Sequence, residues 1–409
     1  MAPYASDDTT SGRRKAVRYV VPATVVGVAA ATIGLVPALA DSGDPDLPKI
    51  TAQQLIEKIA ASDVEQLSGT VKITTDLGLP DLGGLAGSLA SAGGGAGGSK
   101  DGSSADPSAR LTELASGTHT LRIAADGPDR QKVSLLEDAA EYSVIHDGTD
   151  VWGYDSASNE VYHSTAPQGA DAHGKEHGKG GAEQAPTPKE FADQALKAVD
   201  GTTSVTVDGT VHVAGRDAYK LVVKPKDSAS TVGAISIAVD AKTGLPLKFT
   251  LTPKSGGAAV VDAGFTQVHF AKPAASTFDF TPPKGAKVTE GDDADHSVAG
   301  KEKGGAALPG AAGLGGLDGL NVLGDGWGSI AAFDTGSGSG LPSASSGGDA
   351  GAFGDFLGSF GDKVTGTFGS GTVFKTRLVN ALITDDGKVY AGAVTKDALV
   401  KAADTAAKK

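Results

Sequence analysis

Residues 145–155 read IHDGTDVWGYD, and this segment predicts a β-hairpin. Asp147 and Gly148 are a two-residue turn signal, because Asp and Gly tolerate the positive φ angles that tight hairpin turns require. Ahead of the turn, Tyr142 and Val144 alternate with polar residues, as expected for a strand with one buried face. A second turn signal at 155–159 is followed by a short strand pattern. The region therefore indicates an antiparallel meander.

The same alternation of apolar and polar residues recurs along much of the chain. Its apolar positions are Leu67, Val71, Ile73, Leu77, Leu121, Ile123, Val133, Leu135, Val205, Val207, Val211, Val213, Tyr219, Leu221, Val223, Ile235, Ile237, Val239, Leu245, Leu247, Phe249, Leu251, Val268 and Phe270. Turn signals separate these runs, for example at 208–209, 215–217, 241–244 and 385–388. The pattern predicts about 11–13 strands, which exceeds an eight-stranded barrel. We therefore expect a mainly β fold with some α, an open antiparallel β-half-barrel.

Three segments carry start signals for short helices. Residues 51–54 (TAQQ) form a capping box ahead of an apolar stripe that runs to position 60. Residues 187–190 (TPKE) begin a second helix with proline at its first position, and Thr395 caps a third that runs to about position 403. Because each helix is short and apolar on one side, each must pack its apolar side against another part of the protein. We expect the helices to cover the concave face of the half-barrel.

Composition divides the chain into ordered blocks and inserts. The sequence has 409 residues with 59 glycines. Stretches at 81–109 and 165–186 are rich in small and polar residues and are predicted to be flexible inserts in a domain at 41–290. Residues 291–360 form a Gly/Ala/Ser-rich low-complexity insert, in which the apolar island WGSIAAF at 327–333 favours a strand. Residues 361–409 are expected to complete the same domain, with the tail strands at 372–384 and 389–394 added to its sheet.

The N-terminus carries an export signal. The basic segment RRKAVR at 13–18 precedes an apolar run at 19–40, so the rest of the chain is expected outside the cytoplasm. The run ends in ALA at 38–40, a cleavage pattern, but about 22 residues is also long enough to span a bilayer. Residues 1–40 are therefore either a signal peptide or a membrane anchor, and membrane association through 19–40 requires the uncleaved form.

Composition and motifs argue against several classes of function. The formal net charge is −13 and the pI is about 5.0, so a nucleic-acid partner is not expected. The chain has no cysteine, which excludes disulfides, thiol catalysis and a lipid-modified N-terminal cysteine. It also lacks the G-x-S-x-G, phosphate-loop and H-E-x-x-H motifs. We expect neither enzymatic activity nor a cofactor.

Several histidines near one insert are candidate metal ligands. His163, His173 and His177 lie in or beside the insert at 165–186, with Glu176 between the last two. These side chains are possible zinc or copper ligands, but no regular element orients them. A solvated loop is the favoured interpretation, and no metal is expected.

Four segments resemble one known family. The hairpin at 145–155 is similar to the "DG-x-x-x-W-x-Y-D" hairpin of the lipoprotein-carrier (LolA-like) superfamily. Three later segments resemble its "GR-x-AY-x-L" strand, its "D-x-x-TGLPL" turn and its closing "F-x-F-x-PP". They read GRDAYKL at 215–221, VDAKTGLPL at 239–247 and FDFTPP at 278–283. The four matches keep their order and cover about residues 50–290.

The resemblance implies an open half-barrel whose hydrophobic cavity accepts acyl chains. A related periplasmic sigma-E regulator with this fold senses lipoproteins or lipopolysaccharide and acts on an anti-sigma factor. We expect an exported cell-envelope protein of a high-GC Gram-positive bacterium such as an actinomycete. Its expected partner is an acyl lipid or lipoprotein acyl chains, and the alternative is a membrane regulatory protein. A structural domain with a filled core and no ligand is a third interpretation.

The candidate cavity residues are apolar strand positions and two aromatics. For Trp152 and Tyr154, placement in the core is favoured over contact with a lipid tail. The candidates are Val71, Ile73, Leu121, Ile123, Val133, Trp152, Tyr154, Leu221, Ile235, Ile237 and Phe249.

Overall fold

The structure, a computed structural model, describes residues 44–78, 103–107, 110, 114, 116–165, 201–291, 321–334 and 361–408. Residues from Asp46 onward belong to one compact unit. The predicted export segment at 19–40 and the predicted helix from 187 lie outside the described residues. Within the described ranges, no helix has the length and apolar character needed to cross a membrane.

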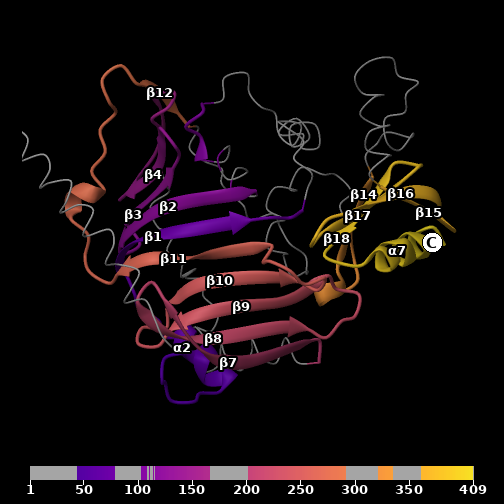
Figure 1. The fold of residues 1–409 in the computed structure, drawn as a ribbon. Coiled ribbons are helices and arrows are strands. Elements are labelled where there is room, and N and C mark those ends of the chain that lie inside the picture. The colour runs from indigo at the N-terminus through magenta and orange to yellow at the C-terminus, as the bar shows by residue number, and fades with distance from the viewer. Residues whose placement is uncertain are drawn as a thin grey trace, which may run out of the picture. The chain divides into compact units, whose positions relative to one another are not determined.

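Twelve strands form one large open sheet, which confirms the prediction of a mainly β, antiparallel fold. The first six strands in the chain are β1 (Gln66–Thr75), β2 (Gly117–Asp126), β3 (Arg130–Leu136), β4 (Glu141–Asp147), β5 (Asp150–Asp155) and β6 (Glu160–Thr165). The other six are β7 (Thr203–Val213), β8 (Arg216–Pro225), β9 (Val232–Asp240), β10 (Pro246–Pro253), β11 (Val261–His269) and β12 (Lys287–Glu290). Their order in the sheet is β12-β6-β5-β4-β3-β2-β1-β11-β10-β9-β8-β7 (Figure 1). All neighbours are antiparallel except β12, which pairs with β6 in parallel.

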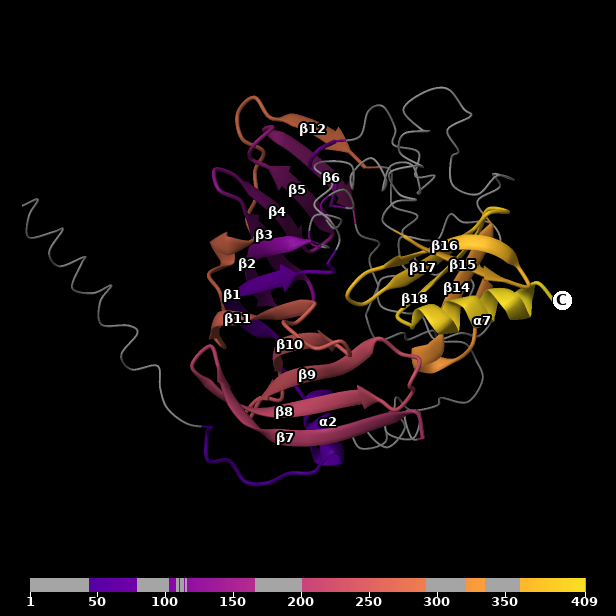
Figure 2. The same cartoon turned by 45° about the vertical axis from the view of Figure 1, so that its right-hand side comes forward.

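The sheet is strongly curved where β7 and β11 approach each other. Three strands separate them, so in a flat sheet they would lie about 19 Å apart. Their Cα atoms nevertheless come within 8 Å. Register shifts in the β1–β11, β7–β8 and β9–β10 pairs add bend, because an extra residue in one strand increases local twist. Figure 2 shows one continuous curved sheet from β6 to β7.

One face of this sheet, which we call the apolar face, can be followed through the register. From β1 it runs to one side through the pairs Val71↔Leu121, Leu121↔Leu135 and Leu135↔Tyr142. To the other side it runs through Ile73↔Ala263, Ala263↔Phe249, Phe249↔Ile237 and Ile237↔Leu221. Because side chains alternate between faces, the intervening residues of β1 and β2, such as Thr70 and Arg122, point to the opposite face.

Helix α2 (Ala52–Ala60) packs on the apolar face. Its predicted capping box is confirmed: Gln54 N–H donates to Thr51 Oγ1 at 3.2 Å, and Thr51 N–H donates to Gln54 Oε1 at 2.8 Å. Leu55 is fully buried in a cluster with Tyr219, Leu221 and Val239. The helix therefore covers the apolar face at β7–β9.

The C-terminal strands form a second sheet, so the prediction that they extend the first one is wrong. Its six strands are β13 (Asn321–Leu323), β14 (Ile330–Asp334), β18 (Lys388–Gly392), β17 (Asn380–Thr384), β16 (Gly369–Lys375) and β15 (Asp362–Gly366), in that order. The island at 327–333 does contain a strand, β14, which pairs with β18. The tail strands thus find a partner within the predicted low-complexity insert and pair there instead.

The last helix, α7 (Lys396–Ala406), belongs to this second sheet. Leu399 and Ala403 are fully buried against Val373, Leu382 and Tyr390. The expectation that this helix covers the concave face of the half-barrel is therefore wrong, because its apolar stripe is used by its own sheet. Thr395 is the N-cap residue as predicted, although its side chain makes no capping hydrogen bond.

Candidate functional site

The structure brings nine of the eleven candidate residues together on the apolar face. Their shared position follows from the two-residue period of the strands, which repeats across each antiparallel pair. The nine are Val71, Ile73, Leu121, Ile123, Val133, Leu221, Ile235, Ile237 and Phe249. Leu221 is buried and Val133 is 43% exposed, whereas the other seven are partly buried. A partly exposed apolar surface therefore runs across the middle of the sheet.

Trp152 and Tyr154 do not share this face. Their neighbour Gly153 pairs with Val144 on the apolar face, so both aromatic side chains point to the opposite one. There they pack against Phe280, with ring centroids 5.5 Å and 5.7 Å apart. Both aromatics therefore line a small core on the far side of the sheet from the other nine candidates.

Chain segments cover the apolar face at several places. Besides α2 at β7–β9, Leu378 and Trp327 pack at the end of β9–β11 in a cluster that includes Ile235. Trp327 Nε1 donates a hydrogen bond to Thr203 Oγ1 at 2.7 Å, at the start of β7. At β4–β6 the face is covered by residues 103–107 together with Arg110, which we call the Ser104 segment.

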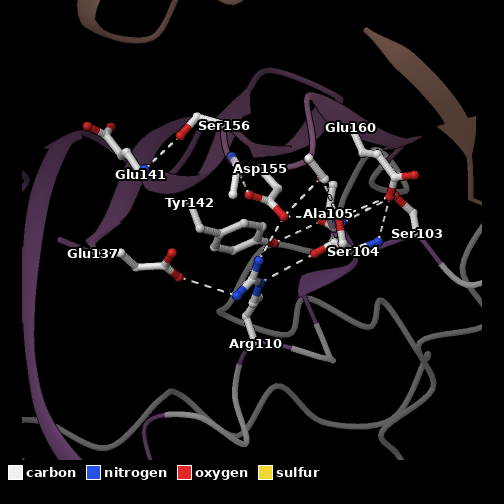
Figure 3. A network of polar contacts seen from close by, with 12 residues as sticks. Ser103, Ser104, Ala105, Arg110, Glu137, Glu141, Tyr142, Asp155, Ser156 and Glu160 are labelled. Atoms are coloured by element: carbon white, nitrogen blue, oxygen red, sulfur yellow. Dashed lines mark hydrogen bonds and ion pairs between the residues drawn. The ribbon is translucent and has the colours of Figure 1, made fainter. Parts of the chain in front are cut away.

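The Ser104 segment is held by polar contacts, as Figure 3 shows. Tyr142 Oη donates to Ala105 O at 3.0 Å, and Ala105 is fully buried. Ser104 N–H donates to Glu160 Oε2 at 2.8 Å, and Ser104 Oγ donates to Asp155 Oδ2 at 2.9 Å. The acceptors Asp155 and Glu160 lie on β5 and β6, on the same face as Tyr142.

Arg110 closes this network from the other side. Its Nη2 lies 2.8 Å from Asp155 Oδ2, and its Nη1 lies 3.3 Å from Glu137 Oε1. The guanidinium also lies over the ring of Tyr142, 5.4 Å from the centroid. Because the Asp155 side chain is only 3% exposed, this ion pair is shielded from solvent more than a surface pair is.

Sequence reasoning missed the Ser104 segment, whose residues 103–107 fall within the predicted flexible insert at 81–109. Its composition is small and polar, and the prediction weighed apolar burial, whereas hydrogen bonds to carboxylates hold this segment in place. One signal was present in the sequence. Gly153 interrupts β5, and a glycine inside a strand often marks the close approach of another backbone. A Cβ atom on Gly153 would lie 2.2 Å from Ala105 O.

Hydrogen bonding keeps both acceptor carboxylates ionised. Burial raises the pKa of Asp155, but hydrogen bonds from Ala157, Ser104 and Ser158 and the charge of Arg110 outweigh it, so the pKa is lowered. The Ser104 N–H, followed by Lys287, lowers the pKa of Glu160 to about 2. The Ser104 segment is therefore anchored to two negative charges across the neutral pH range.

Replacing Glu160 by glutamine is expected to lower stability in a pH-dependent way. Because the folded-state pKa of Glu160 lies below its ordinary value of 4.5, its contribution is present above about pH 5 and is lost as the pH falls toward 2. The free energy of unfolding of wild type and Glu160→Gln should therefore differ most above pH 5 and converge near pH 2. Urea denaturation at a series of pH values measures this difference, and a constant gap would contradict the assignment.

The histidines do not form a metal site in the described part of the chain. No group of three or more His, Cys, Asp or Glu side chains has the geometry to hold a metal ion there. His163 lies on β6 between two carboxylates, Asp150 and Glu290. His173, His177 and Glu176 lie outside the described residues.

A known protein family matches the part of the chain that contains most of the twelve-stranded sheet. The family described as "Predicted periplasmic protein (DUF2092)" matches residues 104–290, from the Ser104 segment to β12. No curated protein matches the chain.

Several solved structures are similar to the chain at low identity. The complex of MucA and MucB from Pseudomonas aeruginosa matches at 16% identity, over 86% of this chain and 96% of that chain, with a TM-score of 0.38. An uncharacterised conserved protein from Thermus thermophilus matches at 13% identity over 58% and 98%, with a TM-score of 0.31. A LolA superfamily protein from Nitrosomonas europaea matches at 12% identity over 57% and 99%, with a TM-score of 0.21.

Proposed function

We propose that this protein is an exported, non-catalytic carrier-like protein that binds acyl chains of lipids or lipoproteins on its apolar face. The observation that carries the proposal is the partly exposed apolar surface formed by Val71, Leu121, Ile237 and their neighbours. An extended acyl chain is a suitable occupant, because it needs apolar area without specific polar partners. Export agrees with the description of the matching family as a predicted periplasmic protein.

The expected affinity follows from the size of the buried surface. Each buried methylene contributes about 0.8 kcal/mol, so eight methylenes provide roughly 6 kcal/mol before the entropic cost of association. Affinity in the micromolar range therefore requires burial of most of a long chain and not only its tip. Fatty acids of 16 or 18 carbons are accordingly the first ligands to test.

Substituting Leu121 by aspartate is expected to weaken fatty-acid binding at least tenfold. Leu121 lies at the centre of the apolar face, and a charge there would have to be desolvated beneath a bound chain. The matched control is Thr120→Asp, because the adjacent residue on β2 points to the opposite face. Binding is measured by titrating the exported domain with a fluorescent fatty acid, and native mass spectrometry reports lipid that co-purifies.

Two outcomes would overturn this proposal. One is a wild-type protein that neither takes up the fluorescent fatty acid nor carries co-purified lipid. The other is equal binding by Leu121→Asp and Thr120→Asp, which would place the ligand elsewhere. Circular dichroism and thermal unfolding of both variants establish that a loss of binding does not come from a loss of fold.

The alternative function predicted from sequence is a membrane-anchored sensor that acts on an anti-sigma factor or another signalling partner. The crystal structure of MucB in complex with MucA describes a partner of that protein. For the present chain the state of the N-terminus separates the two functions, because a carrier must leave the membrane and a sensor gains from a tether. N-terminal sequencing of the mature protein tests this. A start at Asp41 favours the carrier, and an intact N-terminus favours the sensor.

A further inference from the structure

The last strand of the twelve-stranded sheet is held weakly by apolar contacts. β12 has four residues, lies at the edge of the sheet and pairs with β6 in parallel. Its one large apolar residue, Val288, is 43% exposed. Hydrophobic burial therefore contributes little to the attachment of β12, and its hydrogen bonds and ion pairs must supply the rest.

Besides the pairing with β6 itself, polar contacts hold both ends of β12. At the first end, Lys287 N–H donates to Asn159 O at 3.2 Å, and Lys287 Nζ lies 3.2 Å from Glu160 Oε1. At the second end, Gly291 N–H donates to His163 O at 2.6 Å, and Glu290 Oε2 lies 2.7 Å from His163 Nδ1. The ring of His163 is thus the side-chain anchor for the second end.

His163 faces a carboxylate on each of its ring nitrogens. Nδ1 meets Glu290 from β12, and Nε2 lies 3.0 Å from Asp150 Oδ1 on β5. The ring is also stacked on Trp152, with centroids 3.8 Å apart and an interplanar angle of 17°. A neutral imidazole has one N–H and can donate to one of these carboxylates, whereas the imidazolium donates to both. The geometry therefore fits the protonated ring.

The surrounding charges favour the same protonation state. Burial lowers the pKa of His163, but the hydrogen bonds to Asp150 and Glu290 outweigh it, so the pKa lies above its ordinary value of 6.5. Asp150 and Glu290 are the described charged groups that act on this ring. Glu160, the partner of Lys287 at the other end of β12, does not titrate in this range, because its pKa is about 2.

We propose that β12 is a displaceable edge strand whose attachment to β6 depends on the proton of His163. The charged ring links Glu290 to Asp150. Loss of the proton leaves one N–H for two carboxylates, so the ring no longer bridges them and the attachment of the strand weakens. Within the described residues β12 is the last strand before β13 of the second sheet, so its release lengthens the connection between the two sheets. The length of that connection thus depends on pH.

The sign of the pH dependence follows from the raised pKa. The stabilisation is fully present below the ordinary histidine value of 6.5, as long as the carboxylates remain ionised. It is lost as the pH rises through the higher folded-state pKa of His163. β12 should therefore be attached at pH 6 and loosened at pH 9.

Amide hydrogen exchange of β12 tests the proposal. Protection factors at Lys287 and Gly291, corrected for the intrinsic effect of pH, are expected to fall at least fivefold between pH 6 and pH 9 in the wild type. His163→Gln cannot be charged, so its protection should be low and independent of pH. The matched control is His212→Gln, which removes an exposed histidine paired with Asp217 at 3.0 Å on the β7–β8 hairpin and should behave as the wild type.

His163→Gln could lower protection by disturbing the stack on Trp152, so a second variant is needed that leaves the ring unchanged. Glu290→Gln leaves the ring in place, and Glu290 is 71% exposed, so the fold should tolerate the change. This variant should also lose the pH dependence of protection. The proposal is overturned if wild-type protection is equal at pH 6 and pH 9, or if Glu290→Gln retains the full wild-type change.

Discussion

Gly153→Ala is expected to expel the Ser104 segment from the apolar face. The added Cβ would lie 2.2 Å from the backbone oxygen of Ala105, which is closer than real Cβ contacts occur. The oxygen cannot move aside alone, because it accepts the hydrogen bond of Tyr142 Oη and belongs to a fully buried residue. Relief of the clash therefore requires the whole segment to shift, which also breaks the contacts of Ser104 with Asp155 and Glu160.

Trypsin cleavage after Arg110 measures this displacement. In the wild type the guanidinium of Arg110 is held by Asp155 and Glu137, so the side chain is not free to enter a protease. We expect cleavage at this position to be at least tenfold faster in Gly153→Ala, since proteolysis follows the population of the open form. Mass spectrometry of the fragments assigns the site.

The matched control for this experiment is another strand glycine of the same sheet. A Cβ on Gly264 would lie 2.9 Å from Cγ of Lys248 on β10 and meets no residue of the Ser104 segment. Gly264→Ala should therefore be cleaved after Arg110 at the wild-type rate. Equal cleavage of the two variants would show that the close approach of residue 105 to β5 does not hold the Ser104 segment.

Leu55→Ala is expected to destabilise the protein by about 2–5 kcal/mol, the range for truncation of a fully buried leucine. Leu55 is the buried residue of α2 and packs against Tyr219, Leu221 and Val239. A nine-residue helix is not stable by itself in water, so its attachment to the sheet depends on this contact. Chemical denaturation followed by circular dichroism measures the change in the free energy of unfolding.

The control for Leu55→Ala is Val133→Ala on the same face. Val133 is 43% exposed, so its truncation removes little buried area and should cost less than about 1 kcal/mol. If Leu55→Ala costs no more than Val133→Ala, α2 does not contribute to the stability of the sheet in the way that its packing indicates.

The part of the candidate site that depends on strand periodicity was predicted from sequence. The parts that depend on contacts between distant segments were missed. The nine apolar candidates share a face because alternation along each strand is a local property that the register preserves. Placement of Trp152 and Tyr154 in a core was the favoured interpretation, but their contact with Phe280 was not predicted, since it joins positions more than 120 residues apart. The Ser104 segment was missed because its hydrogen bonds leave no periodic pattern in the sequence.

The sequence by itself determined the local structure: the strand character of the chain, the turns between strands and the start of α2 at its capping box. These features depend on interactions within a few residues of the chain. Only the tertiary structure decided which strands share a sheet, where α7 packs and what covers the ends of the apolar face. Those outcomes depend on the free energy of contacts between distant segments, such as β14 with β18 and Ala105 with β5. A local feature such as Gly153 can mark a close approach, but it does not identify the segment that approaches.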